Sequence, residues 1–339
     1  MNRFRLPLDR FTSLLIGTVA LATLLPAQGM AMQVLKGATV AAIAALFFLH
    51  GAKLSRNAIV SGAGHWRLHL VVFASTFLLF PLLGLLLRPL LSPLVTPELY
   101  LGILFLCVLP STVQSSIAFT SIARGNVPAA VCSASASSLL GIIITPLLAG
   151  LLLGSTASTG SGNALASMGR IMVELLLPFV AGQASRRWIG GWVDRNKGML
   201  QFVDQGSILL VVYVAFSEAI LQGLWHQVAP LSLAGVAMVD GILLALALFS
   251  TRVAARALGF NRADEVTAVF CGSKKSLANG VPMAGVLFSS HAVGMLVLPL
   301  MLFHQMQLMV CAVLAKRYAR LAEEEPAAIK YSYNHHQRI

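Results

Sequence analysis

The sequence predicts an all-α membrane protein with ten transmembrane helices, and composition and run length are the observations that predict it. Of the 339 residues, 57% are hydrophobic and only 11% are charged, and the mean hydropathy is +0.82. Soluble domains carry about 25% charged residues, so soluble enzymes and disordered chains are excluded. A spanning helix needs about 20 apolar residues. Long runs such as residues 137–153 lack the alternating polarity of a transmembrane β-barrel.

Ten apolar segments follow one another along the chain, most of them separated by charged or polar residues. In the first half they cover residues 11–27, 37–53, 68–87, 99–123 and 127–153 (spans 1 to 5). In the second half they cover residues 166–183, 208–222, 231–250, 265–288 and 293–315 (spans 6 to 10). The Gly/Ser-rich stretch between spans 5 and 6 is predicted to be a flexible linker. The predicted units are therefore residues 1–154, the linker 155–165, residues 166–316 and a tail at 317–339.

Lysine and arginine are distributed unevenly between alternate loops, and cytoplasmic loops carry the excess of these residues. With ten spans, 19 of the 24 basic residues fall on the side that holds both termini. Lys36, Arg88 and Arg170 fall on the other side, and Lys274 and Lys275 lie within span 9. Both termini are therefore predicted to be cytoplasmic. The net charge of +12 reflects this topology, and no nucleic-acid motif accompanies it.

The two halves of the sequence echo each other. The segment TVQSSIA in span 4 (Thr112–Ala118) resembles GSKKSLA in span 9 (Gly272–Ala278). Three weaker pairs are Leu54–Ile59 with Phe216–Ile220, Leu24–Gly29 with Leu176–Gln183, and ITPLL of span 5 with VLPLM of span 10. Because five is odd, a duplicated five-span unit enters the membrane from the opposite face. The echoes therefore predict an inverted repeat, the architecture of many secondary transporters.

One span in each half carries a helix interruption at a corresponding place. Span 4 has Pro110 followed by a polar run, and span 9 has residues 272–276 followed by Asn279 and Pro282. Unwound backbone inside a membrane is tolerated only in protein or beside a watery cavity. Paired interruptions point to a substrate site, and half-helix N-termini suit anions. The alternative is a pair of ordinary proline kinks with serines bonded to their own backbone.

The candidate binding residues are polar side chains at these two interruptions, together with one acid of span 7. They are Thr112, Gln114, Ser115, Ser116, Ser273, Lys274, Lys275, Ser276, Asn279 and Glu218.

Two adjacent lysines inside span 9 are the most unusual feature. A cation at a helix centre costs roughly 2.5–3.5 kcal/mol on insertion scales. Anion binding, proton coupling or a fixed charge in place of a bound metal ion would explain Lys274 and Lys275, and so would a structural ion pair. Glu218 is a candidate partner, while Glu174 and Asp240 are further acids within apolar spans. Spacing alone does not pair them.

The sequence contains no phosphate loop, nucleophile triad or cluster of metal ligands. We therefore predict no enzymatic activity, no cofactor and no metal site. Nothing in the sequence calls for an obligate protein partner.

Two segments carry a resemblance to a known family. Leu109–Ser138 and Asn261–Gly280 resemble the bile acid:sodium symporter family, closest to the bacterial branch that is similar to solute carrier family 10 member seven. The resemblance covers spans 1 to 10. It implies a panel domain of spans 1, 2, 6 and 7 and a core domain of spans 3–5 and 8–10. It also implies that spans 4 and 9 are broken and cross each other.

The chain departs from the sodium-transporting members at several motif positions. Their Ser-Asn pair of the first crossover stands here as Ser115-Ser116, and the glutamine of span 3 falls near Thr76. Their acid of the second crossover falls on Val269. Their Gln-Asn-Ser run falls on Ser273, Lys274 and Lys275. These departures argue against coupling to sodium.

The sequence therefore predicts a secondary transporter of the bacterial inner membrane that moves a small organic anion by alternating access. Its partners are that anion and the lipid bilayer, and its coupling ion is Na⁺ or H⁺, if there is one. A proton-coupled or uncoupled carrier, and a non-transporting membrane regulator of ion homeostasis, are the alternatives.

Overall fold

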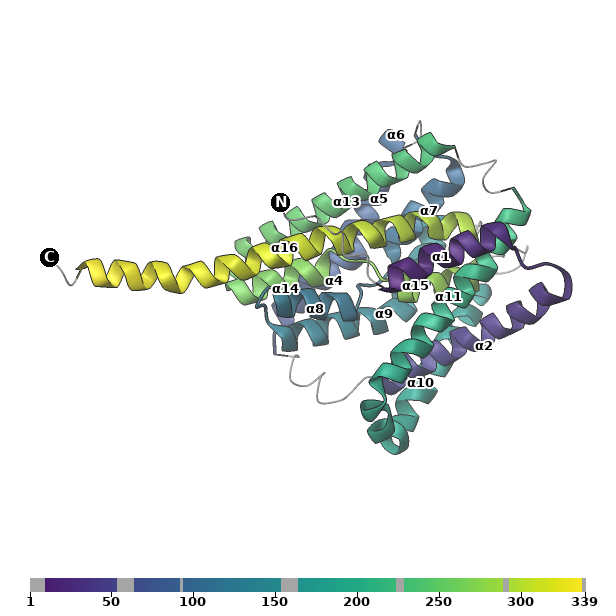
Figure 1. Cartoon of the computed structure of the whole chain (residues 1–339), viewed down its shortest axis with the longest axis horizontal. Coiled ribbons are helices and arrows are strands. Elements are labelled where there is room, and N and C mark those ends of the chain that lie inside the picture. Colours follow the sequence, from purple (N-terminus) through teal and green to yellow (C-terminus); the bar gives the residue numbers. More distant parts are fainter. Residues whose placement is uncertain are drawn as a thin grey trace.

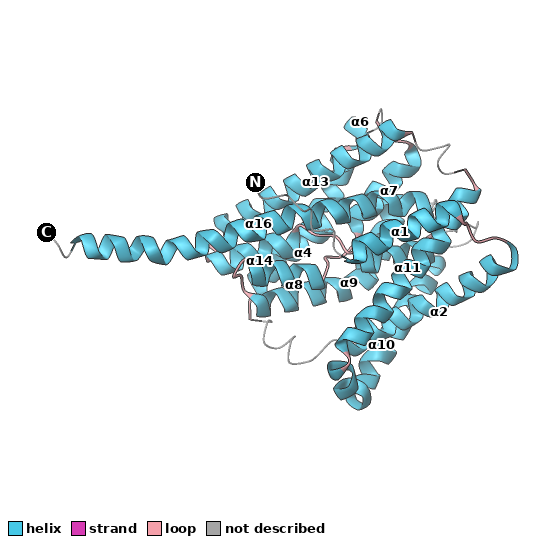
Figure 2. Cartoon of the chain, viewed as in Figure 1, coloured by secondary structure: helices cyan, strands magenta, loops and turns pink. Residues whose placement is uncertain are grey.

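The computed structural model describes residues 10–53, 64–91, 94–153, 164–223, 229–288 and 293–336, and within them the regular elements are helices (Figures 1 and 2). The predicted all-α fold is confirmed. Most of the predicted linker, residues 155–163, and the echo at residues 54–59 lie outside the described ranges.

The first helices overlap spans 1 to 3. Helix α1 covers Arg10–Leu24 and α2 covers Gly29–Lys53, so that α2 begins before the predicted start at residue 37 and includes Lys36. The next span begins as α4 (Trp66–Ala74), widens into the π-helical turn η1 (Ser75–Leu79) and continues as α5 (Phe80–Leu86). The short helix α6 (Arg88–Leu91) follows. Because π-turns leave a backbone group without its usual α-helical partner, η1 bears directly on the site described below.

Span 4 is broken as predicted. Helix α7 (Pro97–Val108) begins where the Thr96 hydroxyl accepts a hydrogen bond from the Leu99 N–H, and it ends just before Pro110, which has no N–H to continue the helix. Helix α8 covers Gln114–Ile122, and α9 covers Val127–Leu153. We call residues 109–113, between α7 and α8, the first break.

The second half contains a corresponding interruption. Its helices are α10 (Ala164–Arg195), α11 (Lys197–Leu221), α13 (Pro230–Ala257), α14 (Arg262–Gly272), α15 (Leu277–Leu287) and α16 (Val293–His336). Residues 273–276, between α14 and α15, form the second break.

Several helices extend beyond the predicted spans. α10 continues to Arg195 and α11 begins at Lys197, although the sequence predicts no span between residues 183 and 208. α16 continues past the predicted boundary at residue 316 and projects from the bundle (Figure 1). Apolar runs mark only the part of a helix that contacts lipid or core, whereas backbone hydrogen bonding continues into polar sequence.

Among the described residues, six helices are long and apolar enough to cross a membrane. They are α2, the continuous helix from Trp66 to Leu86, α9, α11, α13 and the segment Val293–Ala322 of α16. α7 and residues 13–24 of α1 are shorter apolar helices. The chain is therefore a multi-pass membrane protein.

The helices form two groups. α2 packs against α10 and α11, and α1 packs against α11, and Figure 1 shows α2, α10 and α11 gathered on one side of the molecule. α4, α5, α7–α9 and α13–α16 contact one another in the other group. α2 and α10 approach closely at Gly51 and Gly182, where a Cβ atom would lie about 2.0 and 1.9 Å from a carbonyl oxygen of the opposite helix.

Candidate functional site

The two breaks lie against each other inside the larger helix group. The Ser276 N–H donates to the Pro110 carbonyl across 2.9 Å, which joins the second break directly to the first. Gly141 of α9 makes room for the first break, because a Cβ atom there would lie 2.6 Å from Cβ of Pro110. Far-separated residues of spans 4 and 9 therefore meet at one point.

The C-terminal carbonyls of α14 are capped by serine hydroxyls from three other segments. Helix ends leave their last carbonyls without partners in the helix. Here Ser116 donates to the Phe270 carbonyl (3.1 Å), Ser111 to the Cys271 carbonyl (2.6 Å) and Ser75 to the Gly272 carbonyl (2.8 Å). This capping holds the broken helix α14 at the first break and at η1.

Lys275 caps the end of α7 in the same way, but with a charged group. Its ammonium donates to the carbonyls of Thr76, Cys107 and Leu109, each at 2.7 Å, and its side chain is fully buried. The nitrogen also lies 4.2 Å from the centre of the Phe80 ring. Three oxygens and an aromatic face therefore surround a cation at the negative end of a half-helix dipole.

The sequence explains why the carbonyls of Thr76 and Cys107 have no hydrogen-bond partner within their own helices. In the π-turn the Phe80 N–H donates to Ser75. The next residue, Pro81, has no N–H for the Thr76 carbonyl. At the first break the Ser111 N–H donates to the Ser137 hydroxyl (3.1 Å) and leaves the Cys107 carbonyl unused by the helix. The ammonium of Lys275 therefore donates to carbonyl oxygens that η1 and the first break leave without a helix partner.

Lys274 lies on the other side of the second break, beneath the first turn of α8. Its ammonium donates to the Ser115 carbonyl at 2.8 Å and lies 4.1 Å from the centre of the Phe119 ring and 5.5 Å from that of Phe270. It too is fully buried. Neither lysine forms an ion pair with an acid in the part of the chain that the structure describes.

The beginning of α8 is the accessible edge of this arrangement. Gln114 is exposed and Ser115 is partly exposed, whereas Thr112 and Ser116 are buried. The hydroxyls of Thr112 and Ser115 are hydrogen-bonded to each other. The N-cap residue of α8, Val113, provides no side-chain cap, so the first turn combines backbone N–H groups that have no partner within the helix, a positive dipole end and the charge of Lys274.

The remaining candidates of the second break hold the backbone in place. Ser276 caps α15 by accepting from the Asn279 N–H (3.2 Å), and the Asn279 amide donates to the Ser138 hydroxyl (2.8 Å). Ser273 donates back to the Val269 carbonyl (2.6 Å). All three side chains are buried, so these residues shape the break rather than offer a surface to a solute.

The acids are placed differently from the sequence hypothesis. Glu218 of α11 is ion-paired with Lys36 of α2, and within the described ranges no ion pair joins it to Lys274 or Lys275. Glu174 is exposed on α10. Asp240 of α13 is fully buried, and neither of its carboxyl oxygens has a hydrogen-bond partner among the described residues.

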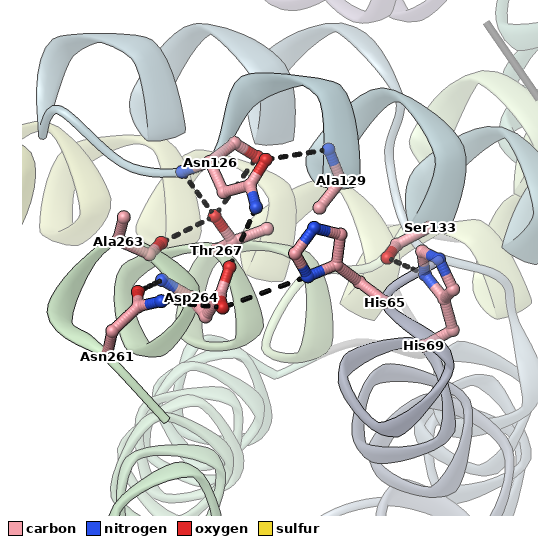
Figure 3. A network of polar contacts seen from close by, with 9 residues as sticks. All are labelled: His65, His69, Asn126, Ala129, Ser133, Asn261, Ala263, Asp264 and Thr267. Atoms are coloured by element: carbon pink, nitrogen blue, oxygen red, sulfur yellow. Dashed lines mark hydrogen bonds and ion pairs between the residues drawn. The ribbon is translucent and has the colours of Figure 1, made fainter. Parts of the chain in front are cut away.

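A second polar network lies where α8 ends and α14 begins (Figure 3). Asn126, in the corner between α8 and α9, donates through its side chain to Asp264 (2.8 Å), and the Thr267 hydroxyl donates to the Ala263 carbonyl (2.8 Å). Asn261 caps α14 and also donates to Asp264, which lies 3.9 Å from His65. The corner after α8 is thereby tied to the beginning of α14.

Several residues that build the site were not among the predicted site residues. Gln307 of α16 accepts from the Lys275 N–H and donates to its carbonyl, each at 2.9 Å, and thus replaces helix hydrogen bonds at the second break. The Thr76 carbonyl and the rings of Phe80 and Phe119 were also missed. Pro81 in an otherwise apolar span was the available signal, whereas backbone carbonyls and aromatic faces leave no polar pattern in a sequence.

Residues 9–320 match the SBF-like CPA transporter family. The chain is 65% identical to an uncharacterised protein of Pseudomonas aeruginosa over 97% of this chain and 98% of that one. It is 58% identical to "Putative symporter YfeH" of Escherichia coli (strain K12) over 96% of each. It is 30% identical to sodium/bile acid cotransporter 7 of Rattus norvegicus over 80% of each. With its broken, interlocked helices, the chain belongs to the SBF-like CPA transporter family and is a membrane transporter rather than an enzyme.

Proposed function

We propose that the protein is a ten-span secondary transporter of the bacterial inner membrane that moves a small organic anion by alternating access. The observation that carries the proposal is the uncapped, exposed beginning of α8 with the ammonium of Lys274 at 2.8 Å from the Ser115 carbonyl. Helix N-termini and cations both favour negative charge. A carboxylate or sulfonate of the solute would bind at Gln114 and Ser115.

The grouping of the helices supports movement of one unit against another. α1, α2, α10 and α11 correspond to the panel that the family resemblance implies, and the remaining helices correspond to the core. The hydrogen bonds described above join the two breaks within the core. A rigid core would therefore rock against the panel around the two breaks, as expected for inverted repeats that rock around a fixed site.

We propose that Lys275 replaces the coupling sodium ion. Backbone carbonyls of unwound helices coordinate Na⁺ in transporters, and here three such carbonyls surround an ammonium at 2.7 Å. A sodium ion added about 4 Å away would be repelled by roughly 4 kcal/mol at an effective dielectric of about 20. A fixed cation would hold the crossover together without an ion from solution.

Proton coupling is the second candidate mechanism. The burial of the Asp240 carboxyl group favours it. Asp240 and Lys275 are both buried ionisable groups. A carboxyl group without a hydrogen-bond partner in protein interior is costly when ionised, and such acids within membranes mark proton relays. Transport driven by a proton gradient and lost in Asp240→Asn would select this mechanism over an uncoupled one.

Uptake into proteoliposomes tests the proposal. A radiolabelled bile acid, the solute in the name of the rat relative, is the first probe, followed by smaller carboxylates and sulfonates. We expect saturable uptake that persists when choline replaces sodium. Failure of every anion to enter, with binding intact, would instead support a regulator that senses the anion.

Gln114→Ala is the matched variant for the same assay. It removes an exposed donor at the beginning of α8, so we expect about tenfold weaker anion binding, the equivalent of roughly one hydrogen bond, and an unchanged melting temperature. Ser121→Ala, at an exposed position near the other end of α8, is the control and should bind as wild type does. Equal affinity in all three proteins would place the site elsewhere.

The ten-span topology predicts where a reporter fused after Ile339 will be active. Since both termini are predicted to be cytoplasmic, alkaline phosphatase, which works only in the periplasm, should be inactive there, and green fluorescent protein should fluoresce. A truncation fused after Arg88, on the predicted periplasmic side, should give the reverse pattern. Strong phosphatase activity after Ile339 would overturn the span count.

A further inference from the structure

A groove of about 560 Å³ runs along the outer surface of α13, α14 and α16. Its floor and walls are apolar and include Leu248, Phe249, Val269, Met309 and Val313. Phe249 and Val313 are 68% and 66% exposed, as expected of side chains that face acyl chains rather than protein. The groove therefore opens to the hydrocarbon of the bilayer.

One end of this groove is basic. Along α13 the apolar lining is followed by Arg252, and along α16 it is followed by Arg317, so that both arginines close the same end. From Met309 to Arg317 the helix rises about 12 Å at 1.5 Å per residue. An apolar groove of this length that ends in two guanidinium groups is complementary to a lipid with an apolar chain and an anionic headgroup.

Among the side chains that the structure describes, positive charge exceeds negative charge at that end. Glu265 accepts from Arg252 (3.1 Å), from Arg256 (3.0 Å) and from the hydroxyl of Tyr318 (3.3 Å), so a single carboxylate is shared between two arginines. Arg317 adds a third cation and is exposed. Within this described set, three arginines and one glutamate carry a net charge of +2, which an anion from the membrane surface would balance.

We propose that this groove binds one anionic phospholipid, with its phosphodiester at Arg252 and Arg317 and an acyl chain along α13 and α16. Basic pockets between transmembrane helices on the cytoplasmic side hold such headgroups, and the topology predicted from the positive-inside pattern would put Arg252 and Arg317 on that side. The lipid would contact Val269 of α14, the half-helix that leads into the second break, and would brace α14 between α13 and α16. This inference does not depend on which solute is transported.

Native mass spectrometry of the purified full chain tests the proposal. Detergent-solubilised protein is mixed with phosphatidylglycerol or phosphatidylcholine that carry the same acyl chains. We expect one phosphatidylglycerol to stay bound at collision energies that remove phosphatidylcholine, and to raise the melting temperature by several degrees more. Inorganic phosphate alone should give no such stabilisation. If it did, or if the two lipids were retained equally, the proposal would be wrong.

Three surface variants separate this groove from a general effect of charge. Arg317→Gln removes a groove cation, and we expect at least fivefold less retained phosphatidylglycerol. Val313→Trp blocks the acyl channel without changing the charge and should have a similar effect. Lys316→Gln removes the same charge from an exposed neighbour that does not line the groove, and it should bind as wild type does. Equal loss in Lys316→Gln and Arg317→Gln would refute a defined site.

Discussion

Lys275→Ala should be stabilised by sodium, an effect that we do not expect for the wild-type protein. The substitution removes the ammonium from the carbonyls of Thr76, Cys107 and Leu109 and leaves these buried oxygens without a donor. Each unsatisfied buried group costs about 1–3 kcal/mol, so we expect the free energy of unfolding to fall by about 3–5 kcal/mol and transport to be lost. The melting temperature in sodium chloride, compared with choline chloride, measures the effect.

Sodium should restore part of this loss because the vacated site is lined by carbonyl oxygens, which replace the hydration shell of an alkali cation. Lys275→Met is the matched control, since its side chain fills the space that alanine leaves empty. Both variants should be destabilised, but only Lys275→Ala should gain stability from sodium, whereas choline is too large to enter. This difference separates a cation site from a general loss of packing.

Two results would contradict the fixed-cation proposal. The first is wild-type uptake that requires sodium and saturates with it, because an occupied site does not need an ion from solution. The second is a Lys275→Ala protein as stable and active as wild type, which would show that the three carbonyls do not need a cation.

Gly182→Ala should separate α2 from α10 and strongly destabilise the protein. A Cβ atom at this position would lie 1.9 Å from the Phe48 carbonyl oxygen and 2.8 Å from its carbon. Both are backbone atoms, so no rotamer change relieves the clash and the helices must move apart. Small residues that permit such close contact drive helix association in membranes. We expect a loss of about 3 kcal/mol, the upper range for overpacking, measured by thermal unfolding in detergent.

Gly191→Ala is the control, because it lies on the same helix and a Cβ atom added there would meet no atom within 4 Å. Alanine has a higher helix propensity than glycine by about 1 kcal/mol, so this variant should be as stable as wild type or slightly more stable. If Gly182→Ala were equally harmless, the close contact between α2 and α10 would not contribute to stability.

The main features of the fold could be predicted from local sequence. Apolar runs set the positions of the helices, and Pro110, which cannot donate a hydrogen bond, set the end of α7. The predicted breaks agree with the observed ones because proline, glycine and clustered hydroxyls act on the backbone within one or two turns. Helix ends in polar sequence, such as Arg195 of α10, were less predictable because hydropathy does not mark them.

The partners of the charged groups could not be predicted. Lys275 and Glu218 are both charged residues in apolar spans, which made them a plausible pair. In the structure Glu218 is ion-paired with Lys36, while Lys275 binds carbonyls that lie 166 to 199 residues away in sequence. Every residue carries a carbonyl, so no residue type indicates which ones a π-turn or a helix break leaves free.

The sequence by itself determined that this chain is helical, that it lies in a membrane, and that polar and cationic groups interrupt two helices. Those properties depend on transfer free energy and on hydrogen bonding between near neighbours, which residue type sets directly. Only the tertiary structure decided that Ser75, Ser111 and Ser116 cap α14, that Lys275 caps α7, and that Lys274 lies beneath α8. These contacts depend on how helices far apart in sequence pack, because packing decides which unpaired backbone groups meet a donor.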